Sequence, residues 1–364
     1  MRLEPLRQSW AARFGSERSG TPATGGPTMA ASEPVPRAPA ATTRMWTGDR
    51  RRRDGALVPP AKPTSYYGRP IIKPPPWKVG LIGAYFLCGG MAGASAALGS
   101  AAHLAGEREL ERRAWVVSLA GLAVSPPLLI ADLGRPMRFL NMLRVFKVTS
   151  PMSVGAWILA ATSAAAAPAA LSSLTGRLPR LGSLAALPAG LLGTTLATYT
   201  GGLLSDTSVP AWHEARYELP FVFAGSAMAS AGGASLLATP PPHSEPARRL
   251  LLVGATLETV ASRVMEHRLG ELAAPYRVGR PGRLSRAALI ATGAGAAIAA
   301  LAGRRRAGGA DAGALTFAGS GLERLAVLEA GISSARDPQA VVAPQRRRVE
   351  ERRARAAAAP PART

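Results

Sequence analysis

From residue 79 onward, apolar residues gather in long runs that are separated by charged or proline-containing segments. About 20 apolar residues in a helix cross the hydrocarbon core of a bilayer, and these runs are of that length. They predict spanning helices at about 79–104, 114–132, 152–175, 183–205, 219–238, 248–266, 285–303 and 312–333. Small residues are dense in the first and seventh runs, which predicts closely packed helices there. The pattern indicates an all-α integral membrane protein with eight transmembrane helices.

An even number of spans places both ends of the chain on one side of the membrane. The loops after the second, fourth and sixth spans share that side, and they carry most of the polar motifs. We call this side the strap face, because the segment 66–78 that precedes the first span is rich in proline and predicts an extended strap. The loops on the opposite face are short.

The two ends of the chain differ in composition from the apolar runs. Residues 1–65 are rich in Arg, Pro, Ala, Ser and Thr without apolar periodicity, which is typical of a disordered basic tail. The predicted layout is this tail, the strap 66–78 at the membrane interface, a membrane domain 79–333 and a basic tail 334–364. Much of the net charge of +22 therefore sits in tails beside a membrane domain, which favours attraction to anionic lipid over nucleic-acid binding. The basic tails also predict cytoplasmic termini.

The segment Asp132 to Ser153 joins the second and third spans and reads DLGRPMRFLNMLRVFKVTSPMS. Its apolar residues recur at helical spacing with bases between them, which predicts a short helix at the membrane surface. One interpretation of Arg138, Arg144 and Lys147 is anchoring to lipid headgroups. The other interpretation is a docking surface for a partner protein.

Aromatic and polar residues converge just below the strap face. At about 1.5 Å per residue, Tyr85 and Tyr199 both lie roughly 10 Å in from that face. A quinone head group requires flat apolar walls, hydrogen-bond partners for two carbonyl oxygens and a nearby acid or histidine. For each aromatic residue alone, anchoring at the membrane interface is the alternative. The residues that we predict to bind a quinone are Tyr85, Asp132, Arg135, Tyr199, Asp206 and His213.

Glu258 lies near the middle of the sixth predicted span. An ionised carboxylate at this depth costs about 3 kcal/mol or more unless it is paired or protonated. Two interpretations stay open: a catalytic role in which Glu258 relays protons, and a buried ion pair with Arg324 of the eighth span.

The cysteine and histidine content limits the cofactors that this chain can hold. Cys88 is the only cysteine, which excludes a disulfide within the chain and an iron–sulfur cluster held by this chain alone. The four histidines lie near predicted helix ends or in loops, whereas a membrane b-type haem needs paired histidines inside helices. We therefore predict no haem, no iron–sulfur cluster and no metal site.

Several motifs together resemble the NrfD/PsrC family, the quinone-reactive membrane subunit of polysulfide-reductase-like oxidoreductases. They are YYGRPIIKPPPWK at 66–78, DLGRP and RFLNMLRVFK within 132–153, YTGGLLSDTSVPAWHEARYELPFVFAGSAMASAGG at 199–233, and SSARDPQAVVAPQR at 333–346. The resemblance covers roughly residues 66–348.

The resemblance implies two four-helix bundles and a site for menaquinone or ubiquinone. It also implies two partners, a four-cluster ferredoxin-like iron–sulfur subunit and a molybdopterin-type catalytic subunit, in a bacterial plasma membrane. Electrons would pass between the iron–sulfur subunit and the quinone pool. The predicted partner interface consists of Arg138, Arg144, Lys147 and Trp212. Two other classes stay open, a secondary ion or proton transporter and a purely structural membrane anchor.

Overall fold

The computed structural model describes residues 69–135 and 137–358, and every regular element within them is a helix. Eight helices of 20 to 31 residues lie at the predicted spans, and we call them the long helices: α2 (Val79–Ala105), α3 (Arg108–Leu133), α5 (Pro151–Thr175), α6 (Pro179–Ser205), α8 (Leu219–Ala238), α9 (Glu245–Leu269), α11 (Gly279–Ala302) and α12 (Arg306–Arg336). The other elements are α4 (Met137–Arg144), α7 (Pro210–Glu214), η2 (Pro241–His243), η3 (Gly270–Ala273), α10 (Ala274–Arg277) and α13 (Pro338–Ala358). The predicted tail 1–65 and strap residues 66–68 lie outside the described residues.

Six of the long helices, α2, α3, α5, α6, α8 and α11, are long and apolar enough to cross a membrane. The remaining two, α9 and α12, have similar length but carry several charged residues along the helix. Each predicted span coincides with one long helix. The helices α3, α11 and α12 begin six residues earlier than predicted, because polar residues form their first turns outside the apolar run. The chain is thus a helical membrane protein.

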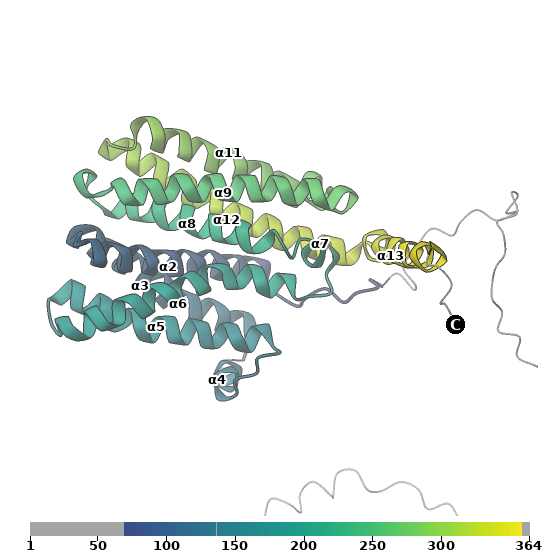
Figure 1. The fold of residues 1–364 in the computed structure, drawn as a ribbon, viewed down its shortest axis with the longest axis horizontal. Helices are drawn as coiled ribbons and strands as arrows, with labels where there is room; N and C mark the ends of the chain where they lie inside the picture. The colour runs from purple at the N-terminus through teal and green to yellow at the C-terminus, as the bar shows by residue number, and fades with distance from the viewer. Residues whose placement is uncertain (1–68, 136, 359–364) are drawn as a thin grey trace, which may run out of the picture. The chain divides into compact units, whose positions relative to one another are not determined.

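Glycines allow the long helices to pack closely. A Cβ added at Gly93 in α2 would lie 2.3 Å from the carbonyl oxygen of Gly193 in α6. At Gly313 in α12, an added Cβ would lie 2.5 Å from the carbonyl oxygen of Gly233 in α8. Small residues let helix backbones approach this closely. Figure 1 shows the result: α8, α9, α11 and α12 lie together, beside α2, α3, α5 and α6.

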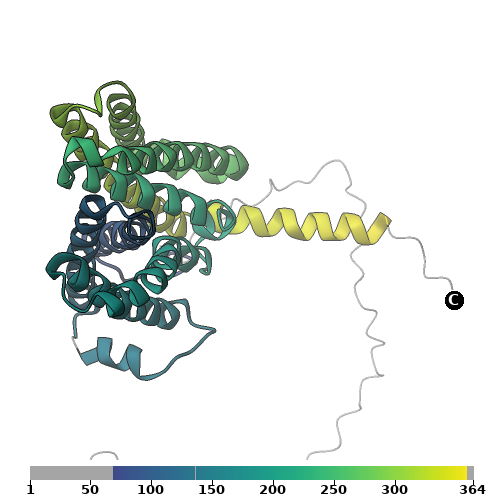
Figure 2. The same cartoon turned by 60° about the vertical axis from the view of Figure 1, so that its left-hand side comes forward.

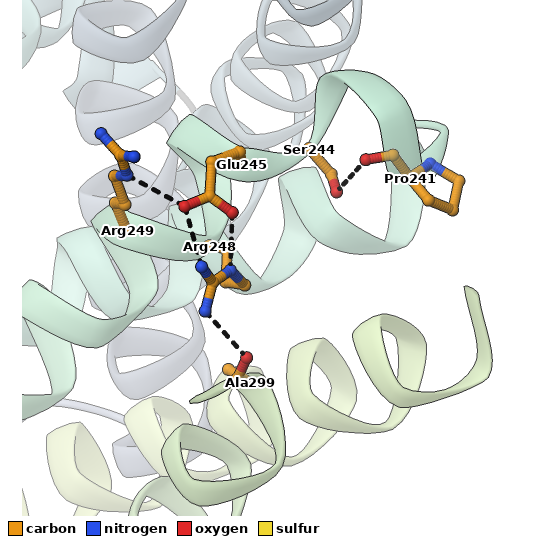
Figure 3. Close-up of polar contacts among 6 residues, drawn as sticks. All are labelled: Pro241, Ser244, Glu245, Arg248, Arg249 and Ala299. Carbon is orange, nitrogen blue, oxygen red and sulfur yellow. Dashed lines mark hydrogen bonds and ion pairs between the residues drawn. The ribbon is translucent and has the colours of Figure 1, made fainter. Parts of the chain in front are cut away.

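A polar cluster fastens the start of α9 to α11 at the opposite face (Figure 3). The Arg248 guanidinium donates to both carboxylate oxygens of Glu245, at 2.9 and 2.8 Å, and Arg249 donates to the same carboxylate at 3.0 Å. Hydrogen bonding from Arg248 holds the pKa of Glu245 below its usual range. Arg248 also donates to the carbonyl of Ala299, at 3.3 Å. This carbonyl is among the last four of α11, which have no partner within their own helix.

The strap face carries the short helices α4 and α7 together with α13 (Figure 1). The segment 334–364 that we predicted as a basic tail is largely helical in its described part, since α12 continues to Arg336 and α13 follows. In Figure 2, α13 points away from the long helices. An ion pair between Arg348 and Glu214 joins α13 to α7.

Candidate functional site

A first cavity of about 430 Å³ lies beneath the strap, where α2, α3, α4, α5 and α6 meet. Its walls are mostly apolar and include the aromatic rings of Trp77 and Phe86. Three of the six residues that we predicted to bind a quinone, Tyr85, Asp132 and Tyr199, line this cavity together. The structure therefore brings half of the predicted set into one apolar site.

The two tyrosines come from different helices, α2 and α6. Tyr85 of α2 is 4% exposed, and its ring centroid is 5.8 Å from that of Phe86. Tyr199 reaches from α6 to α5 because residue 155 has no side chain: an added Cβ there would lie 1.8 Å from Tyr199 Cζ and 1.9 Å from its hydroxyl oxygen. Gly155 thus fixes where the Tyr199 hydroxyl lies in the cavity.

Asp132 holds the strap in place as well as lining the cavity. Its Oδ1 accepts a hydrogen bond from the backbone N–H of Lys78, at 2.7 Å, and Lys78 Nζ donates to the carbonyl of Ala131, at 3.2 Å. Lys78 is the N-cap of α2. The carboxylate therefore lies at the positive end of the α2 dipole and pairs a backbone donor near that end.

A tryptophan of the strap, Trp77, packs on a second tryptophan, Trp212, which comes from α7. Trp77 stacks on Trp212, with ring centroids 5.8 Å apart and planes 24° apart. Trp212 is fully buried, and its Nε1 donates to the carbonyl of Val327 in α12, at 2.8 Å. Although we predicted Trp212 at a partner interface, its indole contacts α12 and the strap and has no exposed surface. Its contact with Trp77 supports a wall of the first cavity.

The other predicted residues lie outside this group. Asp206 and His213 line a second cavity of about 420 Å³ at α7 and α13, together with Glu214 and Arg348. The chain turns into α7 after α6, which takes these two side chains away from Tyr199. Arg135 is exposed and lines neither cavity.

The basic residues of the predicted surface helix are exposed. The helix itself is α4, which has no buried residue. Arg138 and Met142 of α4 line the first cavity, a position that we did not predict for Arg138. Arg144 and Lys147 are exposed at the strap face. The spacing of the apolar residues predicted the helix α4. It did not predict which side of α4 would face the first cavity.

Arg324 of α12 is 0% exposed and joins three helices. Its guanidinium donates to the carbonyls of Phe86 in α2, at 2.8 Å, and Phe223 in α8, at 3.0 Å. It also donates to Ser226 Oγ, at 3.1 Å, and lies 4.7 Å from the centroid of the Phe223 ring. The ion pairs of the described residues do not include one between Arg324 and Glu258. The ion-pair interpretation of Glu258 is therefore not supported.

Glu258 instead lines a third cavity, of about 350 Å³, between α9, α11 and α12. Its Oε2 accepts from Ser320 Oγ, at 3.4 Å. A second buried carboxylate, Glu323, lines the same cavity and accepts from Ser262 Oγ, at 3.0 Å. The lining is polar and the space exceeds the volume of several water molecules, so water can enter. Within the described residues, no group of three or more His, Cys, Asp or Glu side chains is arranged to hold a metal ion.

These features define a helical membrane protein with an apolar, aromatic-walled cavity beneath a proline-containing strap. Residues 71–241 match the family model described as polysulphide reductase, NrfD. This match confirms the resemblance drawn from the motifs, over a range that is a little under half of the chain. The matched range contains every residue that lines the first cavity and ends before Glu258. No curated protein matches the chain.

Proposed function

We propose that the chain is the membrane anchor and quinone-reactive subunit of a multi-subunit oxidoreductase. The first cavity is the observation that carries this proposal. Its volume of about 430 Å³ falls in the range of roughly 300–1,000 Å³ that is typical of small-molecule sites. Its lining combines flat apolar walls with a small number of polar groups, as a quinone ring requires.

Each lining group has a role suited to quinone chemistry. Trp77 and Phe86 supply aromatic surface for the ring, and the hydroxyls of Tyr85 and Tyr199 donate to its carbonyl oxygens. Reduction of a quinone to the quinol takes up two electrons and two protons. Asp132 and Arg138 lie in the same lining, where a carboxylate and a cation assist proton transfer and orient an oxygen.

We further propose that α9 and α12 cross the membrane, which makes eight spans in two four-helix bundles. One bundle is α2, α3, α5 and α6, and the other is α8, α9, α11 and α12. Support comes from the charged residues near the middle of α9 and α12, since Glu258, Glu323 and Arg324 are all buried inside the protein. Charged residues within spanning helices characteristically face the protein interior.

The partners follow from the family. An iron–sulfur subunit of the four-cluster ferredoxin-like type would dock on the strap face, where Arg144 and Lys147 are exposed and the first cavity lies directly below. A molybdopterin-type subunit would carry the catalytic centre, and the assembly would reside in a bacterial plasma membrane. This chain would supply the site for menaquinone or ubiquinone, while the clusters belong to the partner.

We propose a proton-relay role for Glu258. It is buried at the inner end of a polar cavity that also contains Glu323, and it has a single hydrogen bond to Ser320 rather than an ion pair. A carboxylic acid in such a place can take up and release a proton, whereas a paired carboxylate is held in one state.

The decisive experiment measures quinone-linked and dye-linked turnover of the purified complex in parallel. The double variant Tyr85→Phe/Tyr199→Phe should lower quinone-linked turnover at least tenfold and leave electron transfer from the soluble subunits to an artificial dye unchanged. Full quinone turnover in this variant would contradict the proposed site. A chain that binds no quinone at all would be a structural anchor, and ion flux without partner subunits would indicate a transporter.

A further inference from the structure

Three arginines from three different elements surround the third cavity on the side of the strap face: Arg263 of α9, Arg277 of α10 and Arg286 of α11. A 25-residue helix such as α9 is about 37 Å long, whereas the hydrocarbon core of a bilayer is about 30 Å thick. Arg263 lies about 9 Å before the end of α9, and Arg286 about 10 Å after the start of α11. Both positions therefore lie a few Å below the headgroup layer, and a long arginine side chain can reach the headgroups from there.

We call the part of the third cavity lined by Arg263, Arg277 and Arg286 its mouth. Positive and negative charges do not balance there. Glu266 is the carboxylate nearest to Arg277, at 3.7 Å, and Arg277 also donates to the Glu266 carbonyl, at 3.2 Å. Arg286 donates to the carbonyl of Arg277, at 3.4 Å. Neither Arg263 nor Arg286 forms an ion pair with a carboxylate within the described residues. Since Glu258 and Glu323 are buried at the inner end of the cavity, the mouth carries an excess of positive charge.

Two buried hydroxyls in the same lining point to a ligand. Tyr276 is 3% exposed, and its hydroxyl has no hydrogen-bond partner among the described residues. The Thr292 hydroxyl, on the α11 side of the cavity, is likewise buried without a partner. Buried hydroxyls are nearly always paired in folded proteins, by protein groups or by bound molecules. Tyr276 belongs to α10 beside Arg277, so a ligand at the mouth would be within reach of its hydroxyl.

Apolar side chains flank this mouth on the outside of the protein. Val260 and Val264 of α9 are about half exposed, and Ile290 of α11 is 71% exposed. Val260 lies three residues before Arg263 and Ile290 four residues after Arg286, so each shares a side of its helix with that arginine, and Val264 lies one turn beyond Val260. A ligand at this place therefore meets arginines and a hydroxyl at one end, and an apolar surface that continues toward the membrane centre at the other.

We propose that this mouth binds the phosphate of one anionic phospholipid. Arg263 and Arg286 hold the phosphodiester, the Tyr276 hydroxyl donates to it, and the acyl chains lie along Val260, Val264 and Ile290. A free phosphate ion shares the headgroup chemistry but would leave the apolar flank uncovered. The site is separate from the quinone cavity, so it does not depend on the proposed quinone site, although Glu258 of the proposed proton relay lines the same third cavity.

The test is native mass spectrometry of the full chain, purified in mild detergent from membranes that contain phosphatidylethanolamine and phosphatidylglycerol. We expect one retained phosphatidylglycerol, and at least a tenfold lower retention in the variant Arg263→Gln/Arg286→Gln. The matched control is Arg180→Gln/Arg304→Gln, which removes two exposed arginines at the opposite face and should keep the lipid. The variant Arg263→Lys/Arg286→Lys retains the charge and should keep part of the binding, which guards against loss through misfolding.

A second measurement separates the possible sources of the phosphate. The melting temperature of the delipidated protein should rise with phosphatidylglycerol, and not with phosphatidylcholine or with inorganic phosphate at the same concentration. Equal stabilisation by inorganic phosphate would show a free-anion site and overturn the lipid assignment. Equal lipid retention in the Arg263/Arg286 and Arg180/Arg304 glutamine variants would show only bulk lipid, and would also overturn it.

Discussion

Replacement of Gly155 with alanine tests whether the position of Tyr199 determines ligand binding in the first cavity. The added Cβ would lie 1.8 Å from Tyr199 Cζ and 1.9 Å from its hydroxyl oxygen. Non-bonded carbon atoms rest about 3.5–4.0 Å apart, so the ring must move by roughly 2 Å or adopt another rotamer. Overpacking of this kind costs about 1–3 kcal/mol of folding stability.

The effect on binding follows from the loss of one hydrogen bond. If the displaced hydroxyl no longer reaches the quinone oxygen, about 0.5–1.5 kcal/mol is lost. This corresponds to a Kd for quinone that is about 2- to 13-fold higher. The assay is quenching of tryptophan fluorescence by a short-chain quinone, since Trp77 lines the cavity.

Two further variants make the result interpretable. Gly202→Ala lies in the same helix as Tyr199, and its added Cβ would meet nothing within 4 Å, so its Kd should equal that of the wild type. Tyr199→Phe removes the hydroxyl and keeps the ring, so it should weaken binding to a similar extent without the loss of stability. Wild-type affinity in both Gly155→Ala and Tyr199→Phe would refute the role assigned to the hydroxyl.

Three other variants address the strap, the proton path and the buried arginine. Asp132→Ala removes the acceptor for the Lys78 N–H, so we expect about 0.5–2 kcal/mol lower stability and faster hydrogen exchange over 70–80, whereas Asp132→Asn should preserve most of the protection. Glu258→Gln should keep the fold and lower quinone-linked turnover at least tenfold with dye-linked turnover unchanged; normal quinone turnover would exclude the relay. Arg324→Met should destabilise the protein by about 1–3 kcal/mol because it breaks contacts to α2 and α8, and a calorimetric melt of the double variant with Glu258→Gln should show additivity within about 0.5 kcal/mol. Rescue of the Arg324 variant by Glu258→Gln would instead reveal a coupled pair.

The six most apolar of the long helices were predictable because each is encoded locally by a run of apolar residues. The surface helix α4 was likewise predictable from residues 139–146, whose apolar side chains recur at helical spacing. In contrast, α13 could not be predicted from the sequence of the basic tail 334–364, because its apolar residues do not recur at helical spacing. A helix with little amphipathic character gives no such signal.

The site was only partly predictable. A sequence gives the depth of a residue along a predicted helix, but not the direction in which its side chain points or the chain turns. Tyr85 and Tyr199 were placed at equal depth, and they do share a cavity. Asp206 and His213 are at the strap face as expected, but the turn into α7 directs them to another cavity. The partners of Arg324 could not be inferred, since two of its three acceptors are backbone carbonyls of other helices, which leave no trace in a sequence pattern.

The contacts of α12 connect the two buried regions of this protein. Ser320 donates to Glu258 in the third cavity, and Arg324, one turn further along α12, donates to the carbonyl of Phe86, whose ring is a wall of the first cavity. The Phe86 ring also meets Phe223 edge-on, at 5.9 Å, and the Arg324 guanidinium lies over that same Phe223 ring. A change in the charge of Glu258 therefore acts on a helix that also holds the quinone wall. Under the proposed function, the proton-handling carboxylate and a wall of the quinone cavity are thus both held by residues of α12, one turn apart.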